Sequence, residues 1–247
     1  MQPFSTNPKL NPFYYLDYLD YLLSFVSKRY EQVFKAPERE RLQAFQALTK
    51  PARALYTRLL QRKGAYFRVD KLTYSELPTL DVAVKNLINA GFLQPIRGGR
   101  QDLFLSLRTV KELKQLAVLT PLGLSNASRA QIEQTIAETS LELPDLEIVC
   151  VREQTLMALC QHLFFGNEYQ DLSEFVLSDL GLQRFETVDL SLSPAFSSRD
   201  DLDLLRLIGT FREWAKTLER DSLRLKRKPD EASQIELTKA LTSLTEM

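Results

Sequence analysis

Cysteine and histidine are scarce in this sequence of 247 residues, which contains two cysteines and one histidine. The two cysteines, Cys150 and Cys160, are too few to build a disulfide scaffold. Because His162 is the single histidine, no spacing supplies the Cys and His ligands of a structural zinc site. Metal sites built on these two residue types are therefore excluded.

Long hydrophobic runs are also missing. The longest apolar runs, such as residues 21–26, stop well short of the roughly 18 residues that a membrane-spanning helix needs. Residues 1–12 are polar and proline-rich, without the apolar core of a secretion signal. The chain is 44% hydrophobic and 26% charged, which is typical of a folded globular protein. We therefore expect a soluble cytoplasmic protein of one or two domains, with no membrane partner.

Glycine is rare, at eight residues, against an average near about 7% of a chain, and this scarcity favours helices. Prolines and polar caps delimit predicted helices over residues 11–34, 38–48, 50–63 and 78–90. Strands are predicted over residues 65–69, 92–96 and 103–107, the last two joined by a hairpin turn at residues 97–100. This order is that of a winged helix. We predict a mainly α fold with a winged-helix-like unit and a small β-sheet.

A net charge is lacking as well, because 32 Lys and Arg balance 32 Asp and Glu. The zero conceals regions of opposite charge. Residues 37–71 contain nine basic and three acidic residues (+6), residues 133–203 contain three and fifteen (−12), and residues 206–228 contain eight and three (+5). A basic surface attracts a nucleic-acid backbone and an acidic one repels it. Residues 37–71 are therefore the strongest candidate for a DNA-binding segment.

Two arginines lie four residues apart in the predicted helix over residues 50–63. Leu55, Tyr56 and Leu59 form the core side of this helix, while Arg58 and Arg62 project together from it. Two cations on one face suit adjacent phosphates. An ordinary solvated helix face has the same pattern, so both interpretations stay open.

A second helical pair follows the predicted hairpin. Thr109 and Glu112 have the spacing of a capping box at the start of a predicted helix over residues 109–117. A loop that contains Gly123 leads to a second predicted helix over residues 129–139. Helix, loop and helix in about thirty residues have the size of a SAP motif, and an ordinary helical hairpin fits equally well.

Several segments resemble the Fanconi-associated nuclease family. Residues 55–63 (LYTRLLQRK), 71–77 (KLTYSEL) and 89–94 (NAGFLQ) come in that family's order and spacing. Residues 14–16 and 112–117 also match, so the resemblance covers residues 11–140 well and is thinner beyond them, at 177–181 and 199–202.

The resemblance implies a structure-specific DNA nuclease of interstrand cross-link repair, with 5′-flap endonuclease and 5′-to-3′ exonuclease activity. Such proteins have an N-terminal DNA-binding region, a SAP domain, helical repeats and a C-terminal virus-type replication-repair nuclease domain that uses Mg²⁺ or Mn²⁺. The shorter, bacterial kind fits this chain best, which implies a cytoplasmic protein that joins the nucleoid during repair.

The family's catalytic set of carboxylates followed by Glu-x-Lys on a central strand is not found here. Glu112-Leu113-Lys114 lies on a predicted helix, and no Glu-x-Lys follows the predicted strand at residues 146–151, so we interpret these as chance matches. Cys160 and His162 are two residues apart among leucines, which favours core packing over a nucleophile. We expect no catalytic or metal-binding residue in this chain, and we expect Mg²⁺ or Mn²⁺ only in a missing nuclease domain.

The pattern divides the chain into five predicted regions. They are a tail and buried helix (1–36), a winged-helix-like DNA-binding domain (37–107), a SAP-like motif (108–140), a mixed, mostly helical region (141–228) and the start of a helical repeat (229–247).

We expect this chain to be the DNA-recognition portion of such a nuclease, with branched or flap DNA and the missing C-terminal nuclease domain as partners. Neutralisation of backbone phosphates makes such binding specific for DNA shape rather than base sequence. The predicted contacts are Arg53, Arg58, Arg62, Lys63, Arg68, Lys71, Arg97, Arg100, Lys111 and Lys114. Two alternatives stay open: a winged-helix transcription regulator that recognises one duplex sequence, and a non-catalytic scaffold whose basic faces meet an acidic protein.

Overall fold

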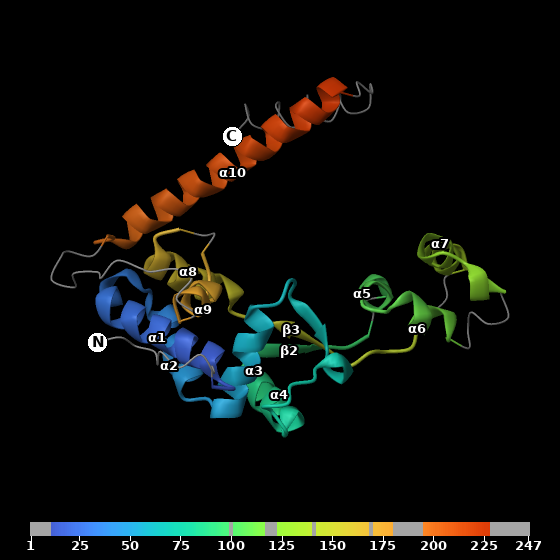
Figure 1. Ribbon diagram of the computed structural model, residues 1–247, viewed down its shortest axis with the longest axis horizontal. Helices are drawn as coiled ribbons and strands as arrows, with labels where there is room; N and C mark the ends of the chain where they lie inside the picture. The colour runs from blue at the N-terminus through green and yellow to red at the C-terminus, as the bar shows by residue number, and fades with distance from the viewer. Residues whose placement is uncertain are drawn as a thin grey trace. The chain divides into compact units, whose positions relative to one another are not determined.

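The computed structural model describes residues 11–98, 101–116, 123–139, 142–167, 170–179 and 195–227 (Figure 1). The chain forms two compact units, residues 1–192 and residues 193–247. In the described ranges, no helix is long and apolar enough to cross a membrane.

The first unit is mainly helical, as the glycine-poor sequence predicts. Its elements, in chain order, are α1 (Tyr14–Arg29), η1 (Glu31–Val33), α2 (Ala36–Gln46), α3 (Lys50–Leu60), β1 (Tyr66–Arg68), η2 (Val69–Lys71), α4 (Leu80–Asn89), β2 (Leu93–Ile96), α5 (Gln101–Ser106), α6 (Val110–Lys114), η4 (Leu124–Asn126), α7 (Arg129–Thr139), β3 (Ile148–Val151), α8 (Gln154–Phe165) and α9 (Ser173–Asp179).

Helix α1 is the centre of the helical layer. Its buried side chains run from Tyr15 to Val26, because α1 packs against both α3 and α8. The rings of Tyr21 and Phe25 meet Phe164 of α8 edge to face, with centroids 5.9 and 5.1 Å apart. The predicted burial of this helix is confirmed, although α1 ends at Arg29 and not near residue 34.

Arg41 of α2 fastens the end of α4 to the turn before α8. Its guanidinium donates to the carbonyls of Ala90 and Gly91 at 3.0 and 3.2 Å and lies 4.2 Å from the ring centre of Phe92. It also pairs with Glu153 at 3.2 Å. Gly91 has a φ of 74°, the left-handed conformation that glycine commonly adopts just after a helix.

Three short antiparallel strands form one sheet in the order β1-β3-β2. On the central strand, Val149 is opposite Phe67 of β1 on one side and Pro95 of β2 on the other. Strand β2 is therefore an edge strand, which is where proline is tolerated in a sheet. The order α3, β1, α4, β2, β3 confirms the winged-helix-like arrangement.

The predicted hairpin is wrong in its second strand. Residues 103–106 belong to the helix α5. The strand that pairs with β2 is instead β3, which lies within the strand predicted at residues 146–151. Leu103 and Phe104 are buried among the helices that follow them, in one cluster with Leu113 and Ile132. A short apolar run does not distinguish strand from helix by periodicity, and here packing against other helices decides the outcome.

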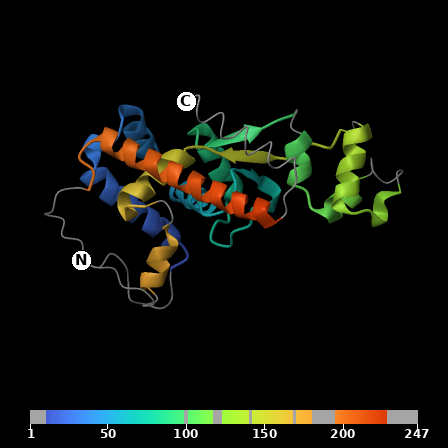
Figure 2. The same ribbon diagram turned by 90° about the horizontal axis from the view of Figure 1, so that it is seen from above.

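The described residues between β2 and β3, within the range 97–147, form a helical unit that we call the inserted unit. Figures 1 and 2 show its helices α5, α6 and α7 beyond one end of the sheet. Its buried cluster, from Leu103 to Leu143, continues into the sheet through Ile148 of β3. The inserted unit and the sheet therefore share a core.

Two arginines hold the inserted unit together by donating to backbone carbonyls. Arg108 is 5% exposed and donates to the carbonyl of Phe104 at 3.2 Å and to that of Pro144. Arg129 donates to the carbonyls of Leu105 and Arg108 at 3.0 and 2.9 Å. The carbonyls at the end of α5, which lack partners within that helix, are satisfied in this way.

Glu112 of α6 connects the inserted unit to β1 and η2. Its carboxylate accepts hydrogen bonds from Lys71 at 2.8 Å, from the backbone N–H of Thr109 at 2.9 Å and from Arg68 at 2.8 Å. These bonds hold the pKa of Glu112 well below its usual range. The capping box predicted from the spacing of Thr109 and Glu112 is confirmed.

The second unit contains α10 (Arg199–Arg227). It begins at residues 199–202, one of the thinner family matches, and the N–H of Asp201 donates to the hydroxyl of Ser198 at 3.2 Å as an N-terminal cap. Apolar side chains along it are exposed, including Leu204 at 57% and Phe211 at 53%. The predicted helical repeat at residues 229–247 lies outside the described residues.

Replacing Leu113 with Ala is expected to lower the free energy of unfolding by about 2–5 kcal/mol, because this side chain is fully buried in the core of the inserted unit. Urea unfolding followed by circular dichroism measures the change. Lys111→Ala, on the exposed side of the same helix, is the control and should stay within about 0.5 kcal/mol. Equal effects of the two variants contradict the shared core.

The contribution of Glu112 to stability is expected to depend on pH. Its folded pKa is below its unfolded value, so the contribution is present above about pH 4.3 and is lost as the pH falls through the folded pKa. Glu112→Gln should therefore be less stable than the parent by about 1–2 kcal/mol at pH 7, and the difference should narrow toward pH 3. The exposed Glu142→Gln serves as the control, and a gap that is constant from pH 7 to pH 3 contradicts the prediction.

Candidate nucleic-acid interface

Two cations follow α3 directly, in the turn that leads into β1. Arg62 and Lys63 are both exposed. Arg62 donates to the hydroxyl of Tyr74 at 3.4 Å, and its guanidinium lies 5.2 Å from the ring centre of Phe67. Among the described residues, neither cation is within ion-pair distance of a carboxylate. Their charges are therefore available to an anionic ligand.

Arg58, one turn before Arg62, is bound within the protein. Its guanidinium donates to one carboxylate oxygen of Glu76 at 2.6 and 3.0 Å and lies 3.8 Å from the ring centre of Tyr15. The Tyr15 hydroxyl donates to the same oxygen at 3.1 Å. Arg58 also lies 5.8 Å from the ring centre of Tyr74. The structure thus brings Arg58 and Arg62 together at Tyr74, as predicted, but Arg58 is already paired.

Burial sets the protonation of this cluster. It raises the pKa of Tyr15 to about 12, which keeps the phenol protonated as a donor. Burial also raises the pKa of Glu76, but hydrogen bonds from its own backbone N–H, Arg58 and Tyr15 outweigh that effect and leave it below its usual value. The carboxylate is therefore charged at neutral pH, and it holds Arg58 in place.

Two further predicted contacts are paired in the same way. Arg53 donates to both carboxylate oxygens of Asp20 at 2.7 Å. Arg68 has a side chain only 9% exposed, held between Asp70 at 2.6 Å and Glu112 at 2.8 Å. DNA contact by these arginines stays a prediction, and the structure gives each of them a role in holding the fold.

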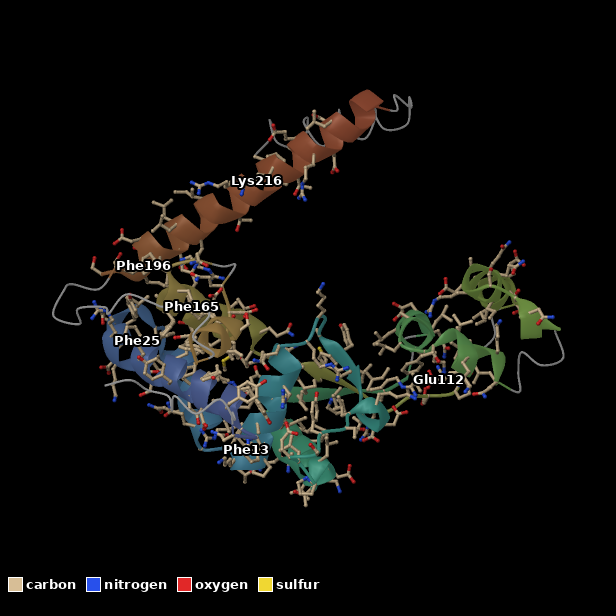
Figure 3. The ribbon with its side chains drawn as sticks, in the orientation of Figure 1. Phe13, Phe25, Glu112, Phe165, Phe196 and Lys216 are labelled. Carbon is tan, nitrogen blue, oxygen red and sulfur yellow. The ribbon has the colours of Figure 1, made fainter. Side chains whose placement is uncertain are left out.

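A second group of cations lies on α6 and beside it, namely Lys111, Lys114 and Lys71. Lys71 pairs with Glu112 but keeps 54% of its side chain exposed, so its remaining N–H donors face solvent. Lys111 is exposed and Lys114 half-buried, three residues apart on one side of the helix. Neither lysine has an ion-pair partner in the part of the chain that the structure describes. Figure 3 shows Glu112 on the side of α6 nearest the sheet.

Two of the predicted contacts, Arg97 and Arg100, belong to the tip of the predicted hairpin, whose second strand is wrong. Arg97 follows β2 and is exposed, while Arg100 lies outside the described residues. Arg97 lines a cavity of about 600 Å³ between α4 and the β2–β3 pair.

The rim of this cavity includes Lys85, a cation that our sequence analysis missed, because the helix that contains it carries no basic excess. Three carboxylates, those of Asp81, Asp145 and Glu147, share the rim. They repel phosphates, so the cations after α3 and on α6 suit a DNA backbone better than this cavity does.

The described residues contain no group of three or more His, Cys, Asp or Glu side chains placed to hold a metal ion. Cys160 and His162 are buried in α8, at 0% and 8% exposure, in agreement with the predicted core packing. Burial raises the pKa of the Cys160 thiol to about 12, so it is protonated at neutral pH and is a poor nucleophile.

Comparison with known proteins adds to this geometry. Residues 13–94, from the start of α1 to β2, match the family described as FAN1, HTH domain. A Fanconi-associated nuclease 1 homolog from Pseudomonas aeruginosa is 34% identical over 202 residues, covering 78% of this chain and 36% of the relative. A homolog from Arabidopsis thaliana is 28% identical over 204 residues, covering 73% of this chain and 23% of the relative.

A solved structure is similar over most of the chain. The crystal structure of paFAN1 bound to 2-nucleotide 5′-flap DNA with a gap has a TM-score of 0.71 and 29% identity, and the match covers 84% of this chain and 40% of that one. The chain thus spans well under half the length of each of these relatives. It corresponds to the N-terminal region of the Fanconi-associated nuclease family, with that family's helix–turn–helix domain at residues 13–94.

Proposed function

We propose that this chain is the DNA-recognition part of a structure-specific nuclease and binds branched or flap DNA through backbone phosphates. The proposal is carried by the cations that have no ion-pair partner among the described residues, Arg62 and Lys63 after α3 and Lys111 and Lys114 on α6. They belong to a fold that is similar to that of a relative solved with 5′-flap DNA.

The spacing of these cations suits a backbone. Strand β1 separates the turn after α3 from η2, and its three residues span about 10 Å. Duplex DNA carries one charge per about 1.7 Å of its axis, so a distance of this size along a duplex spans several phosphates. Phosphate contacts of this kind position a protein on DNA without reading bases, which favours recognition of a branch or flap by shape.

For the whole protein we propose a Mg²⁺- or Mn²⁺-dependent nuclease of interstrand cross-link repair, acting in the bacterial cytoplasm and at the nucleoid, with the inserted unit as its SAP-like part. The residues described here do not fit the metal. Glu112, the acidic residue of the Glu-x-Lys match, is bonded to Lys71, Thr109 and Arg68. We therefore assign this chain the binding of DNA and derive no hydrolytic step from its residues.

Affinity for a 5′-flap DNA should fall steeply with salt, because binding releases counterions from the neutralised phosphates. With five phosphate contacts, from the four cations without an ion-pair partner and from Lys71, the logarithm of the binding constant should fall with the logarithm of the salt concentration with a slope of about −4 to −5. Fluorescence anisotropy of a labelled flap from 50 to 200 mM NaCl measures it, with an unbranched duplex as the control. A flat response contradicts the proposal. Tighter binding to one duplex sequence supports the regulator alternative, and no binding at 50 mM supports the scaffold alternative.

Replacing Arg62 and Lys63 together with Ala should weaken flap binding and reduce the salt slope by about 2, because two phosphate contacts are lost. The control is a double variant, Lys28→Ala with Lys35→Ala, which removes the same two positive charges from a different part of the protein. Lys28 lies thirteen residues beyond Tyr15 on α1, or about 20 Å along the helix axis from the Arg58 cluster. If the control pair lowers the slope as much as the test pair, net charge and not this surface governs binding.

A further inference from the structure

Glu112 is an acidic residue that lies between two lysines in the sequence of α6 and is bonded to two further cations. Lys111 precedes it, Lys114 follows two positions later, and Lys71 contacts it. By charge alone, such a carboxylate repels DNA phosphates, and its removal should strengthen binding. Its position therefore needs another explanation.

The contacts of Glu112 join three elements. One carboxylate oxygen accepts from Lys71 at 2.8 Å, and the other accepts from Arg68 at 2.8 Å and from the backbone N–H and hydroxyl of Thr109 at 2.9 and 3.0 Å. Arg68 is itself fixed, because Asp70 accepts from it at 3.0 and 2.6 Å. Helix α6 is thereby held to β1 and η2.

Helix α6 of the inserted unit is too short to keep a fixed orientation without contacts to the rest of the fold. Beside the apolar core that includes Ile148, polar contacts join α6 to the sheet side in the described residues, and those of Arg68 and Lys71 converge on Glu112. Helix α6 is five residues long, far below the roughly 12 residues at which an isolated helix becomes stable in water. The directions of Lys111 and Lys114 therefore depend on what fixes this single turn.

We infer that Glu112 is a positioning residue that strengthens DNA binding by fixing Lys111 and Lys114 relative to Lys71 and β1, so that both groups of cations reach the backbone together. The inference rests on the proposed function. On its charge alone, the Glu112 carboxylate should weaken DNA binding, whereas this inference predicts that it strengthens DNA binding.

The test is Glu112→Gln, which removes the charge and keeps a side chain of the same length that can cap α6. Positioning predicts that affinity for the labelled 5′ flap at 100 mM NaCl falls about tenfold and that the salt slope shrinks by up to about 2, as the Lys111 and Lys114 contacts are lost. Unchanged or higher affinity overturns the inference.

A control separates positioning from general destabilisation. Ile132→Val weakens the core of the same unit by about 0.5–1.5 kcal/mol and leaves the ion pairs intact. It should bind the flap as the parent does. An equal loss of affinity in this variant overturns the inference, because loosening of the unit then accounts for the effect.

A double-mutant cycle identifies the residues through which Glu112 acts. In a Lys111→Ala, Lys114→Ala background, Glu112→Gln should change affinity less than twofold, because the lysines it positions are gone. A loss as large as in the parent overturns the inference. If the parent protein does not bind flap DNA, the proposed function fails and this inference fails with it, whereas a parent that binds and a Gln variant that binds equally well reject the inference alone.

Discussion

The pairing of β3 between β1 and β2 is the constraint on which the first unit depends. Strand β3 reaches the sheet only after the chain has passed through residues 97–147, and closure of so long a loop has an entropic cost that grows with its length. The insertion offsets this cost by folding: its core continues through Ile148 of β3, and Glu112 holds α6 to β1. Sheet, inserted unit and the placement of the cations are thus parts of one arrangement.

Local signals explain why much of the helical part could be predicted from the sequence. Prolines start α2 and α3, Gly91 ends α4, and Thr109 with Glu112 caps α6, because each of these effects acts within a few residues. The pairing of the third strand could not be predicted in this way, although the sequence predicts a strand at residues 146–151. Residues 103–107 and 146–151 are both short apolar runs, and only their tertiary neighbours make one a helix and the other a strand.

The candidate site, like the fold, could be predicted from the sequence only in part. Charge counting finds the basic region but treats its arginines alike. Three of them bind partners that are distant in sequence: Arg58 and Glu76 are 18 positions apart, Arg53 and Asp20 33, and Arg68 and Glu112 44, although Arg68 also pairs with the nearby Asp70. The sequence contains no local sign of these distant pairs. The fold therefore sorts the cations into those that hold the protein together and those that face solvent.

The β2–β3 ribbon has a consequence for how such a protein changes over time. Ile96 and Ile148 are paired neighbours, so the chain leaves the sheet and returns to it at adjacent points. Whatever lies between these points can lengthen, shorten or be exchanged without moving the strands, since insertions are tolerated best where entry and exit are close. The inserted unit can therefore change in length or content while the helices around α1 stay unchanged, as long as its core contact with Ile148 and the bonds of Glu112 are kept.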